Sequence, residues 1–477
     1  MKWEPDTIRE STGNIVIPFT LPGSDNRMVL LGNVIEGRVS ILNESEYEIF
    51  QTISEDTDES LLSALLHEGY LTTCTQEQEE QQLIHLYESR KQVREPRAVF
   101  VVTYACNFRC TYCWSEHLFT PHSKWMNTIM NKKTIDAAIE ALDHIPALEN
   151  LNLLSLYGGE PFLPSTRHLV EYIMNTMPGT VAFQANTNGY YLKEFVPLLA
   201  EHDIAGLGVT LDGMSSVHNS RRKQADGSGT FQQIVEGIDA ALDEGIPVGV
   251  RINVDRDNIS HLPEFGQWIK DHGWTHRKDI SFEMTPVRPG KDNHPPALLT
   301  YTQMCAEIIN LLHKECDLLS IIKYQWEYMK EGYLARAIAD GTDLTPRPFY
   351  CSAHIQAYIF DPLGNIYTCP RAVGDEAFSI GRFIPEVHFN DHVREWKTRH
   401  VLAIDPCMNC EYALVCGGGC AYEASLAHNT LQKGHCERFK AFIEYGLPLY
   451  VKWRLNPQEG YSIGLNVEKE KKGEKKK

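Results

Sequence analysis

The chain has 477 residues, of which 43% are hydrophobic and 23% charged, and its formal net charge is −18. These values are typical of a globular protein with about two to four domains, and the acidic balance argues against nucleic acid as a general partner. No apolar run approaches the roughly 18 residues of a membrane span, and no signal peptide is visible, so we expect a cytoplasmic protein without a membrane partner. In that compartment the 13 cysteines indicate metal or redox ligands rather than disulfides.

Residues 1–95 are predicted to form a small winged-helix-like domain that ends in a polar helical linker. Short strands are expected over residues 14–22 and 28–42, and the second stretch turns near Gly37. A helix follows, for which Asn43 or Ser45 is the plausible cap, and then a second helix, a returning strand and the linker. The stretch LGNVIEGRVSILNESEYEIF is similar to the N-terminal part of enzymes that modify ribosomally made peptides. The resemblance implies that this unit binds the leader of a substrate peptide, which would add as a strand to an open sheet edge. The alternative is a structural cap without a binding role.

The next feature is a loop with three cysteines that directly follows an apolar strand. Cys106, Cys110 and Cys113 have the spacing C-x3-C-x2-C, and the aromatic Tyr112 precedes the third. Three thiolates fall short of a structural zinc site, which takes four ligands, but they suit three irons of a [4Fe–4S] cluster. The pattern resembles the radical S-adenosylmethionine (SAM) superfamily. That resemblance implies that the fourth iron binds SAM, that these cysteines are catalytic, and that a donor such as flavodoxin or ferredoxin supplies the electron for a 5′-deoxyadenosyl radical.

Residues 96–300 show six alternations of an apolar strand with a helix. Such an alternation predicts a parallel sheet, and six units without a clear seventh and eighth indicate a partial (β/α)6 barrel rather than a closed one. In α/β barrels the chemistry lies in the loops after the carboxyl ends of the strands. The fold class is therefore α/β, with an N-terminal winged-helix-like domain and a cysteine-rich C-terminal domain.

Polar motifs follow the second, third and fourth strands of this predicted barrel. They contain Gly-Gly-Glu-Pro, Asn-Thr-Asn-Gly, and a Thr-Leu-Asp-Gly stretch that ends in two arginines. The resemblance implies that the following residues position SAM: Tyr112, Gly158, Gly159, Glu160, Pro161, Asn188, Thr210, Asp212 and Arg222. Alternatives stay open. Asn188 is also typical of a turn, and Asp212 could be a strand-end cap. Arg221 could bind the SAM carboxylate in place of Arg222.

Seven further cysteines lie within residues 345–445, and their spacing resembles that of the SPASM domain, which adds two auxiliary [4Fe–4S] clusters to radical SAM enzymes. The resemblance implies one complete set and one set that is a ligand short; the two sets are Cys407, Cys410, Cys416 and Cys436, and Cys351, Cys369 and Cys420. Either a distant thiol such as Cys316 fills the gap or one iron is open. With SAM and the first cluster, the expected cofactors are SAM and three [4Fe–4S] clusters. Residues 301–344 would form a helical bridge, and residues 446–477 a disordered charged extension.

These features are similar to those of enzymes that mature ribosomally made peptides. An open auxiliary iron would bind a substrate cysteine as thiolate, and the expected reaction removes a hydrogen from a precursor peptide and links the sulfur to a carbon as a thioether. The leader of the precursor would bind the N-terminal domain. The alternatives are another peptide modification (a C–C or C–O crosslink, epimerisation or formylglycine formation) and a non-catalytic iron–sulfur scaffold.

Overall fold

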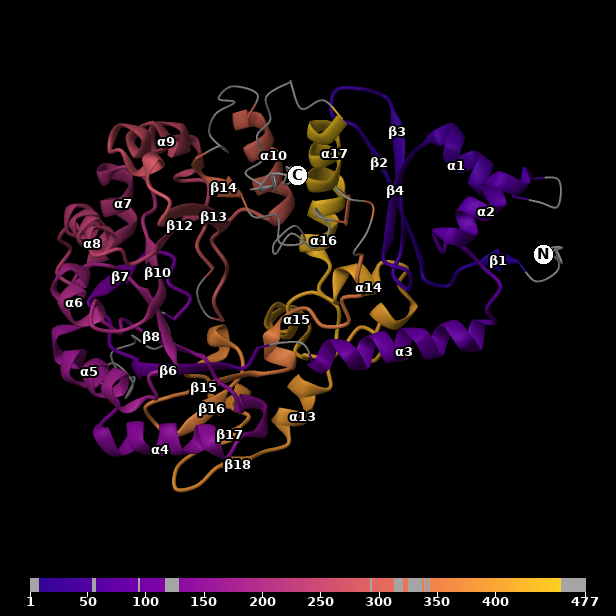
Figure 1. The fold of residues 1–477 in the computed structure, drawn as a ribbon. Coiled ribbons are helices and arrows are strands. Elements are labelled where there is room, and N and C mark those ends of the chain that lie inside the picture. Colours follow the sequence, from indigo (N-terminus) through magenta and orange to yellow (C-terminus); the bar gives the residue numbers. More distant parts are fainter. Residues whose placement is uncertain are drawn as a thin grey trace, which may run out of the picture.

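The structure, a computed structural model, describes residues 8–53, 57–92, 95–115, 128–291, 294–312, 321–324, 337–338, 341 and 344–455. Figure 1 shows an N-terminal domain on the right, an α/β barrel on the left, and the cysteine-rich region below and between them. The helix α3 (Gln76–Gln92) runs from the first domain toward the cysteine-rich region.

The N-terminal domain contains a three-stranded antiparallel sheet packed against two helices. Its strands are β2 (Asn14–Thr20), β3 (Arg27–Asn33) and β4 (Arg38–Asn43), in the order β2-β3-β4, and the helices are α1 (Glu44–Gln51) and α2 (Glu59–His67). The cap of α1 is Asn43, which accepts a hydrogen bond from the Glu46 amide at 2.9 Å and donates its own amide to the Glu46 carboxylate at 2.8 Å. A short pair, β1 (Arg9–Glu10) with β5 (Leu71–Thr72), closes the domain.

The predicted partial barrel is present, and its six strands run parallel in sequence order. They are β6 (Arg97–Thr103), β8 (Leu153–Gly158), β9 (Ala182–Thr187), β10 (Ile204–Thr210), β12 (Val248–Val254) and β13 (Ile280–Pro286). The outer helices are α4 (Lys132–Asp143), α5 (Arg167–Thr176), α6 (Leu192–Leu199), α8 (Phe231–Asp243) and α9 (Leu262–Asp271). Along β10, Leu207 and Val209 are buried whereas Gly206, Gly208 and Thr210 are half exposed. Successive residues of a strand face opposite sides, so the second set lines the inside of the barrel.

The barrel sheet continues into the cysteine-rich region, which makes it eleven-stranded. Beyond β6 come β15 (Ala357–Phe360), β16 (Asn365–Tyr367), β17 (Gly381–Arg382) and β18 (His388–Phe389), and beyond β13 comes β14 (Lys323–Tyr324). β15 pairs in parallel with β6, and the Phe100 and Phe360 rings meet edge to face, 5.7 Å apart. The cysteine-rich region and the first cysteine loop are therefore connected to the same β-sheet.

Short helices carry most of the remaining chain in this region. The α-helical segments are α13 (His392–Lys397), α14 (Ala413–Cys416), α15 (Ala421–His428) and α16 (Glu437–Ala441). Turns of 3-10 helix lie at Pro146–Leu148, Pro164–Thr166, Ile259–His261, Trp274–His276, Ser352–His354, Pro370–Ala372, Glu376–Phe378 and Cys407–Asn409. None of the described helices is long and apolar enough to cross a bilayer.

The expectation of a disordered extension from residue 446 is wrong for its first part. A π-helical turn, Phe442–Gly446, leads into α17 (Leu447–Leu455), whose Leu447, Tyr450 and Val451 are buried. Lys452 Nζ donates to the Pro22 carbonyl of the N-terminal domain at 3.1 Å. Burial of apolar side chains thus orders this segment. The charged run after Leu455 lies outside the described residues, as does most of the expected bridge after α10 (Tyr301–Leu312).

Candidate functional site

The three-cysteine loop follows β6 and is tied to a segment from the far side of the barrel. Strand β7 (Phe108–Cys110) pairs antiparallel with β11 (Arg222–Gln224), and this register places Cys110 opposite Arg222. The Thr111 amide adds a hydrogen bond to the Arg221 carbonyl at 3.0 Å. The stretch after β10 and the cysteine loop therefore form one unit.

The thiols of this loop lie within electrostatic reach of each other. Burial raises the pKa of Cys106, and negative charge at Cys110, Glu160 and Cys113 raises it further. Three thiols that disfavour each other's ionisation in this way are stabilised as thiolates by a cation at their centre. The donor set therefore fits the iron cluster that the spacing predicts.

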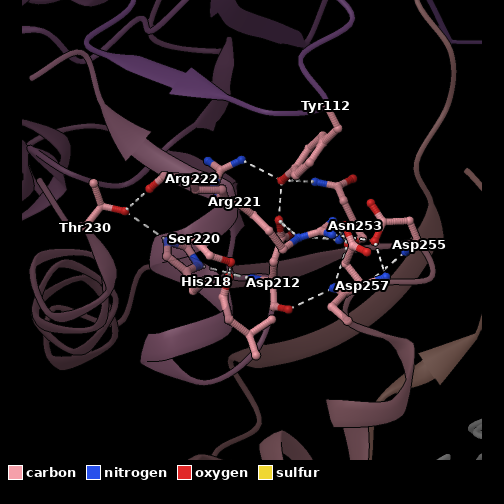
Figure 2. A network of polar contacts seen from close by, with 12 residues as sticks. Tyr112, Asp212, His218, Ser220, Arg221, Arg222, Thr230, Asn253, Asp255 and Asp257 are labelled. Carbon is pink, nitrogen blue, oxygen red and sulfur yellow. Dashed lines mark hydrogen bonds and ion pairs between the residues drawn. The ribbon is translucent and has the colours of Figure 1, made fainter. Parts of the chain in front are cut away.

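A buried polar network holds the aromatic residue before the third cysteine (Figure 2). The Tyr112 hydroxyl donates a short hydrogen bond to the Asp212 carboxylate and accepts from Arg222 Nη1 at 3.1 Å and Asn253 Nδ2 at 3.2 Å. Asp212 is fully buried, and its carboxylate also accepts hydrogen bonds from Arg221 Nε at 3.3 Å and from the backbone N–H of Asn253 at 3.0 Å. Both side chains are thus committed to protein partners, so Asp212 acts on the site by positioning Tyr112.

The same network separates the two rival arginines. All of the Arg221 guanidinium is engaged, because it donates to Asp255 at 2.5 Å, to the Asn253 carbonyl at 3.0 Å and to Asp212. Arg222 is also buried, but within the part of the chain that the structure describes its Nε has no hydrogen-bond partner. A buried donor without a partner is costly, and a bound anion would satisfy it. Of the two guanidinium groups, Arg222 fits the SAM carboxylate.

The Gly-Gly-Glu-Pro motif braces the loops around the cysteines. Glu160 is 1% exposed, and its carboxylate accepts from Thr187 Oγ1 at 2.6 Å, the Asn188 amide at 2.5 Å and the Phe162 amide at 2.9 Å. Burial raises the pKa of Glu160 to about 7, against the lowering effect of these hydrogen bonds. Its carboxylate therefore positions Asn188, whose Nδ2 donates to Asn107 at 2.7 Å and lies 3.9 Å from Cys106 Sγ.

The structure explains why this motif has glycine at two consecutive positions, which sequence analysis did not explain. A Cβ at Gly158 would lie 2.1 Å from the Thr103 carbonyl oxygen, and one at Gly159 would lie 2.4 Å from the Ala105 carbonyl oxygen. The backbone that leads into the cysteine loop therefore occupies the space that a side chain at either position would need. Of the other predicted residues, Pro161 accepts from Thr166 Oγ1 at 2.6 Å through its carbonyl, and Thr210 lies on the inner barrel face.

Tyr157, the residue before the two glycines, lies between cysteines from two parts of the chain. Burial raises the pKa of Tyr157, and negative charge at Cys113 and at Cys369 raises it further. Its ring stacks on Trp114 at 6.5 Å between centroids. Sequence analysis gave Tyr157 no role. The signal that could have found it is strand periodicity, which directs Ser155 and Tyr157 to the inner face of β8.

The C-terminal thiols influence one another's pKa in two groups, and their division into two ligand sets stays a prediction. Burial raises the pKa of Cys369 to about 12, with further raising effects from Cys420 and Cys351. Burial likewise raises the pKa of Cys407 to about 12, with contributions from Cys416, Cys436 and Cys410. Within the described ranges, no three His, Cys, Asp or Glu side chains converge as ligands of a single metal ion. Cys316, the candidate eighth thiol, lies outside those ranges.

Three glycines join the two sets, between Cys416 and Cys420. Their φ angles are +73°, +80° and +72°, a left-handed conformation that side chains disfavour. A Cβ at Gly419 would also lie 1.9 Å from the His435 carbonyl oxygen. Only glycine therefore fits this crowded turn.

A buried ion-pair cluster beside Cys420 supports the region, and we expect it to make stability depend on pH. Glu423 binds Arg438 Nη2 at 2.6 Å and Arg371 Nη1 at 2.8 Å. Burial raises the pKa of Glu423, but Arg438, Arg288 and Arg371 together outweigh it and lower the pKa to about 2. Since the folded pKa lies below the ordinary value of 4.5, stability from this carboxylate is complete above about pH 5 and is lost as pH falls toward 2.

Urea unfolding of the wild type and Glu423→Gln at pH 7 and pH 3 measures this contribution. The free-energy difference between the two proteins should shrink by about 2 kcal/mol between pH 7 and pH 3. Glu386→Gln, which changes an exposed carboxylate, is the control. A difference that stays constant between the two pH values would show that Glu423 is not held ionised by its arginines.

Comparison with known proteins agrees with this geometry. Residues 100–269 match the Radical SAM superfamily. The cysteine-type anaerobic sulfatase-maturating enzyme of Clostridium novyi is 22% identical over 353 residues, which cover 71% of this chain and 91% of that protein. The GTP 3′,8-cyclase of Vibrio cholerae is 29% identical over 172 residues, only 49% of its length.

Two solved structures share the fold. Native anSMEcpe with bound AdoMet superposes with a TM-score of 0.56 at 17% identity, covering 76% of this chain and 100% of that one. Streptococcus suis SuiB superposes with a TM-score of 0.51 at 11% identity, covering 89% and 98%. The fold and the cysteine loop are similar to those of radical SAM enzymes. The chain carries the radical SAM domain at residues 100–269, which implies SAM and a [4Fe–4S] cluster as cofactors.

Proposed function

We propose that this enzyme matures a ribosomally made precursor peptide by forming thioether crosslinks between cysteine sulfur and carbon. The observation that carries the proposal is the position of Tyr157. It lies within electrostatic reach of both Cys113, in the first cysteine loop, and Cys369, in the set with three thiols. A substrate segment bound beside Tyr157 would place one of its residues near the centre that abstracts hydrogen and another of its residues near the centre that binds a thiol.

When bound, the first cluster and SAM supply radical chemistry that removes a hydrogen atom from the substrate. Cys106, Cys110 and Cys113 would hold the cluster, and the unpartnered Nε of Arg222 would bind the SAM carboxylate. Asn188, held by Glu160, presents its amide beside Cys106. Tyr112 and Asp212 keep Arg222 in place through the network in Figure 2.

The C-terminal sets would hold two auxiliary [4Fe–4S] clusters. Cys407, Cys410, Cys416 and Cys436 form a complete ligand set, whereas Cys351, Cys369 and Cys420 leave a position for a fourth ligand. A substrate cysteine in that position would be kept deprotonated and fixed. In this proposal the fourth ligand comes from the substrate and not from Cys316.

The precursor's leader is proposed to bind the N-terminal domain. A groove of about 420 Å³ lies between β2, β3 and α1, and Phe19, Met28 and Tyr47 line it together with the charged Arg27 and Glu48. Apolar walls with charges at the rim suit an extended peptide. The electron donor is proposed to be a flavodoxin- or ferredoxin-like protein.

Similarity to known proteins supports a peptide substrate and suggests a second candidate reaction. The Clostridium novyi relative is a sulfatase-maturating enzyme, and one matching structure, at a TM-score of 0.54, is anSMEcpe with bound AdoMet and the Kp18Cys peptide. Oxidation of a side chain to formylglycine is therefore the second candidate. We favour the thioether because seven C-terminal cysteines leave one auxiliary set short.

Mass spectrometry of co-expressed peptides tests the proposal. Cysteine-containing peptides encoded beside this chain's reading frame would be expressed with it and then alkylated. A thioether requires the loss of two hydrogens per link and cysteines that no longer alkylate. Thiols that still alkylate freely, or a carbonyl product, would refute the thioether, and absence of 5′-deoxyadenosine would indicate a scaffold.

Replacement of Cys351 should separate the two cysteine sets functionally. Cys351→Ala is expected to keep SAM cleavage and to lower crosslinked product at least about 100-fold, because loss of a ligand disables the sulfur site. Release of 5′-deoxyadenosine and product mass would be measured together. Cys74→Ala, in the N-terminal domain, is the matched control. Equal loss of both activities would mean that Cys351 has only a structural role.

A further inference from the structure

Arg399 is a buried cation in the cysteine-rich region without a carboxylate partner. Its side chain follows α13 and is 1% exposed. Its donors reach only carbonyl oxygens: Nε to Leu431 at 2.6 Å, Nη1 to Gly419 at 3.1 Å, and Nη2 to Gly418 at 3.1 Å and Lys433 at 2.8 Å. Among the described residues it forms no ion pair with Asp or Glu.

Two other buried arginines of the protein are neutralised by carboxylates, whereas Arg222 donates to the Tyr112 hydroxyl. Arg221 binds Asp212 and Asp255, and Arg438 binds Glu423. A buried charge without an opposite charge is strongly destabilising, and hydrogen bonds to neutral carbonyls satisfy the donors but not the charge. Arg399 therefore requires a negative group that the carboxylates of the described residues do not provide.

The groups around Arg399 are the cysteines of both C-terminal sets. Gly418 and Gly419, whose carbonyls it binds, lie on the turn that joins Cys416 to Cys420. Burial lowers the pKa of Arg399, and negative charge at Cys351, Cys420, Cys407 and Cys416 opposes that effect. Two of these cysteines belong to each set. Lys397 also lies near Cys351, but it is half exposed.

We propose that Arg399 is the shared counter-charge of the two auxiliary clusters and sets their reduction potentials. The proposal rests on the cluster assignment in the proposed function. Net charge and burial are among the factors that set the potential of an iron–sulfur cluster. A buried guanidinium between two anionic clusters stabilises the reduced form of each, which carries one more negative charge. Arg399 is thus a positioning and electrostatic residue that need not touch the substrate.

Redox titration of the full-length, iron-loaded protein tests this role. The parent protein carries Cys106→Ala, Cys110→Ala and Cys113→Ala, so that signals come only from the C-terminal clusters, and reduced cluster is measured by electron paramagnetic resonance. In Arg399→Gln, the ratio of reduced to oxidised cluster at the parent's midpoint should fall about tenfold, which is about 59 mV for one electron. Arg399→Lys, which keeps the charge, should stay near the parent ratio.

Arg382→Gln is the matched control, because this exposed arginine of the same region also donates to carbonyls, at Leu363 and Ile384. An iron-loaded Arg399→Gln with the parent ratio would overturn the proposal. If Arg399→Gln takes up no iron, Arg399→Lys decides: full iron and the parent ratio support the charge role, and loss of iron or a shifted ratio refutes it. A parent without iron would refute the cluster assignment, and this proposal with it.

Discussion

Arg222→Gln is expected to weaken SAM binding by about 100-fold, or about 2.7 kcal/mol, while the fold is retained. The Nε of Arg222 is a buried donor without a hydrogen-bond partner among the described residues, and Arg222 lies opposite Cys110 in the ribbon of β7 and β11. A guanidinium forms paired, charge-assisted hydrogen bonds with a carboxylate, which an amide cannot replace. Equilibrium dialysis of SAM against the iron-loaded protein measures the effect.

Lys223→Gln, on the same short strand, is the matched control, because Lys223 is exposed and next in sequence. It should bind SAM like the wild type. Arg221→Gln should differ from both, since it breaks ion pairs with Asp212 and Asp255 and lowers stability. Unchanged SAM binding in Arg222→Gln would exclude it as the carboxylate ligand.

Asp212→Ala should lower the free energy of unfolding by about 3–5 kcal/mol, which is the usual cost of breaking a buried ion pair. The change removes the acceptor of the Tyr112 hydroxyl, of Arg221 Nε and of the Asn253 amide, and all of these groups are inside the protein. Urea unfolding monitored by circular dichroism measures the loss. SAM binding should weaken as well, because Tyr112 holds Arg222.

Asp226→Ala changes an exposed aspartate in the turn after β11 and serves as the comparison. Its effect should stay within about 0.5 kcal/mol, as for most surface substitutions. If Asp212→Ala were equally mild, the network in Figure 2 would be a set of replaceable contacts rather than the support of the site.

Local spacing and periodicity predicted much of this protein. The three-cysteine loop, the six parallel strands and the Asn43 cap each depend on residues close in sequence, and the structure contains all of them. Such features are visible in sequence because local geometry restricts which residues fit.

Features that depend on distant contacts could not be predicted in this way. The β7–β11 ribbon has strands of three residues, too short to show a periodic pattern. The choice between Arg221 and Arg222 depends on Asp255, which a sequence pattern does not connect to either. Glu160 was expected to face the cofactor, yet three hydrogen-bond donors surround it. Residues 447–455 were predicted to be disordered because they were grouped with the charged run that follows, although they contain the apolar residues that bury α17.

The pairing of β6 with β15 has a consequence for how the protein is made. Chains emerge from the ribosome N-terminus first, and domains generally fold as they emerge. Here the barrel cannot complete its β6 edge until residues 357–360 have emerged, so the strand that carries the first cysteine loop waits with an open edge. A chain interrupted before β15 would expose this edge and aggregate.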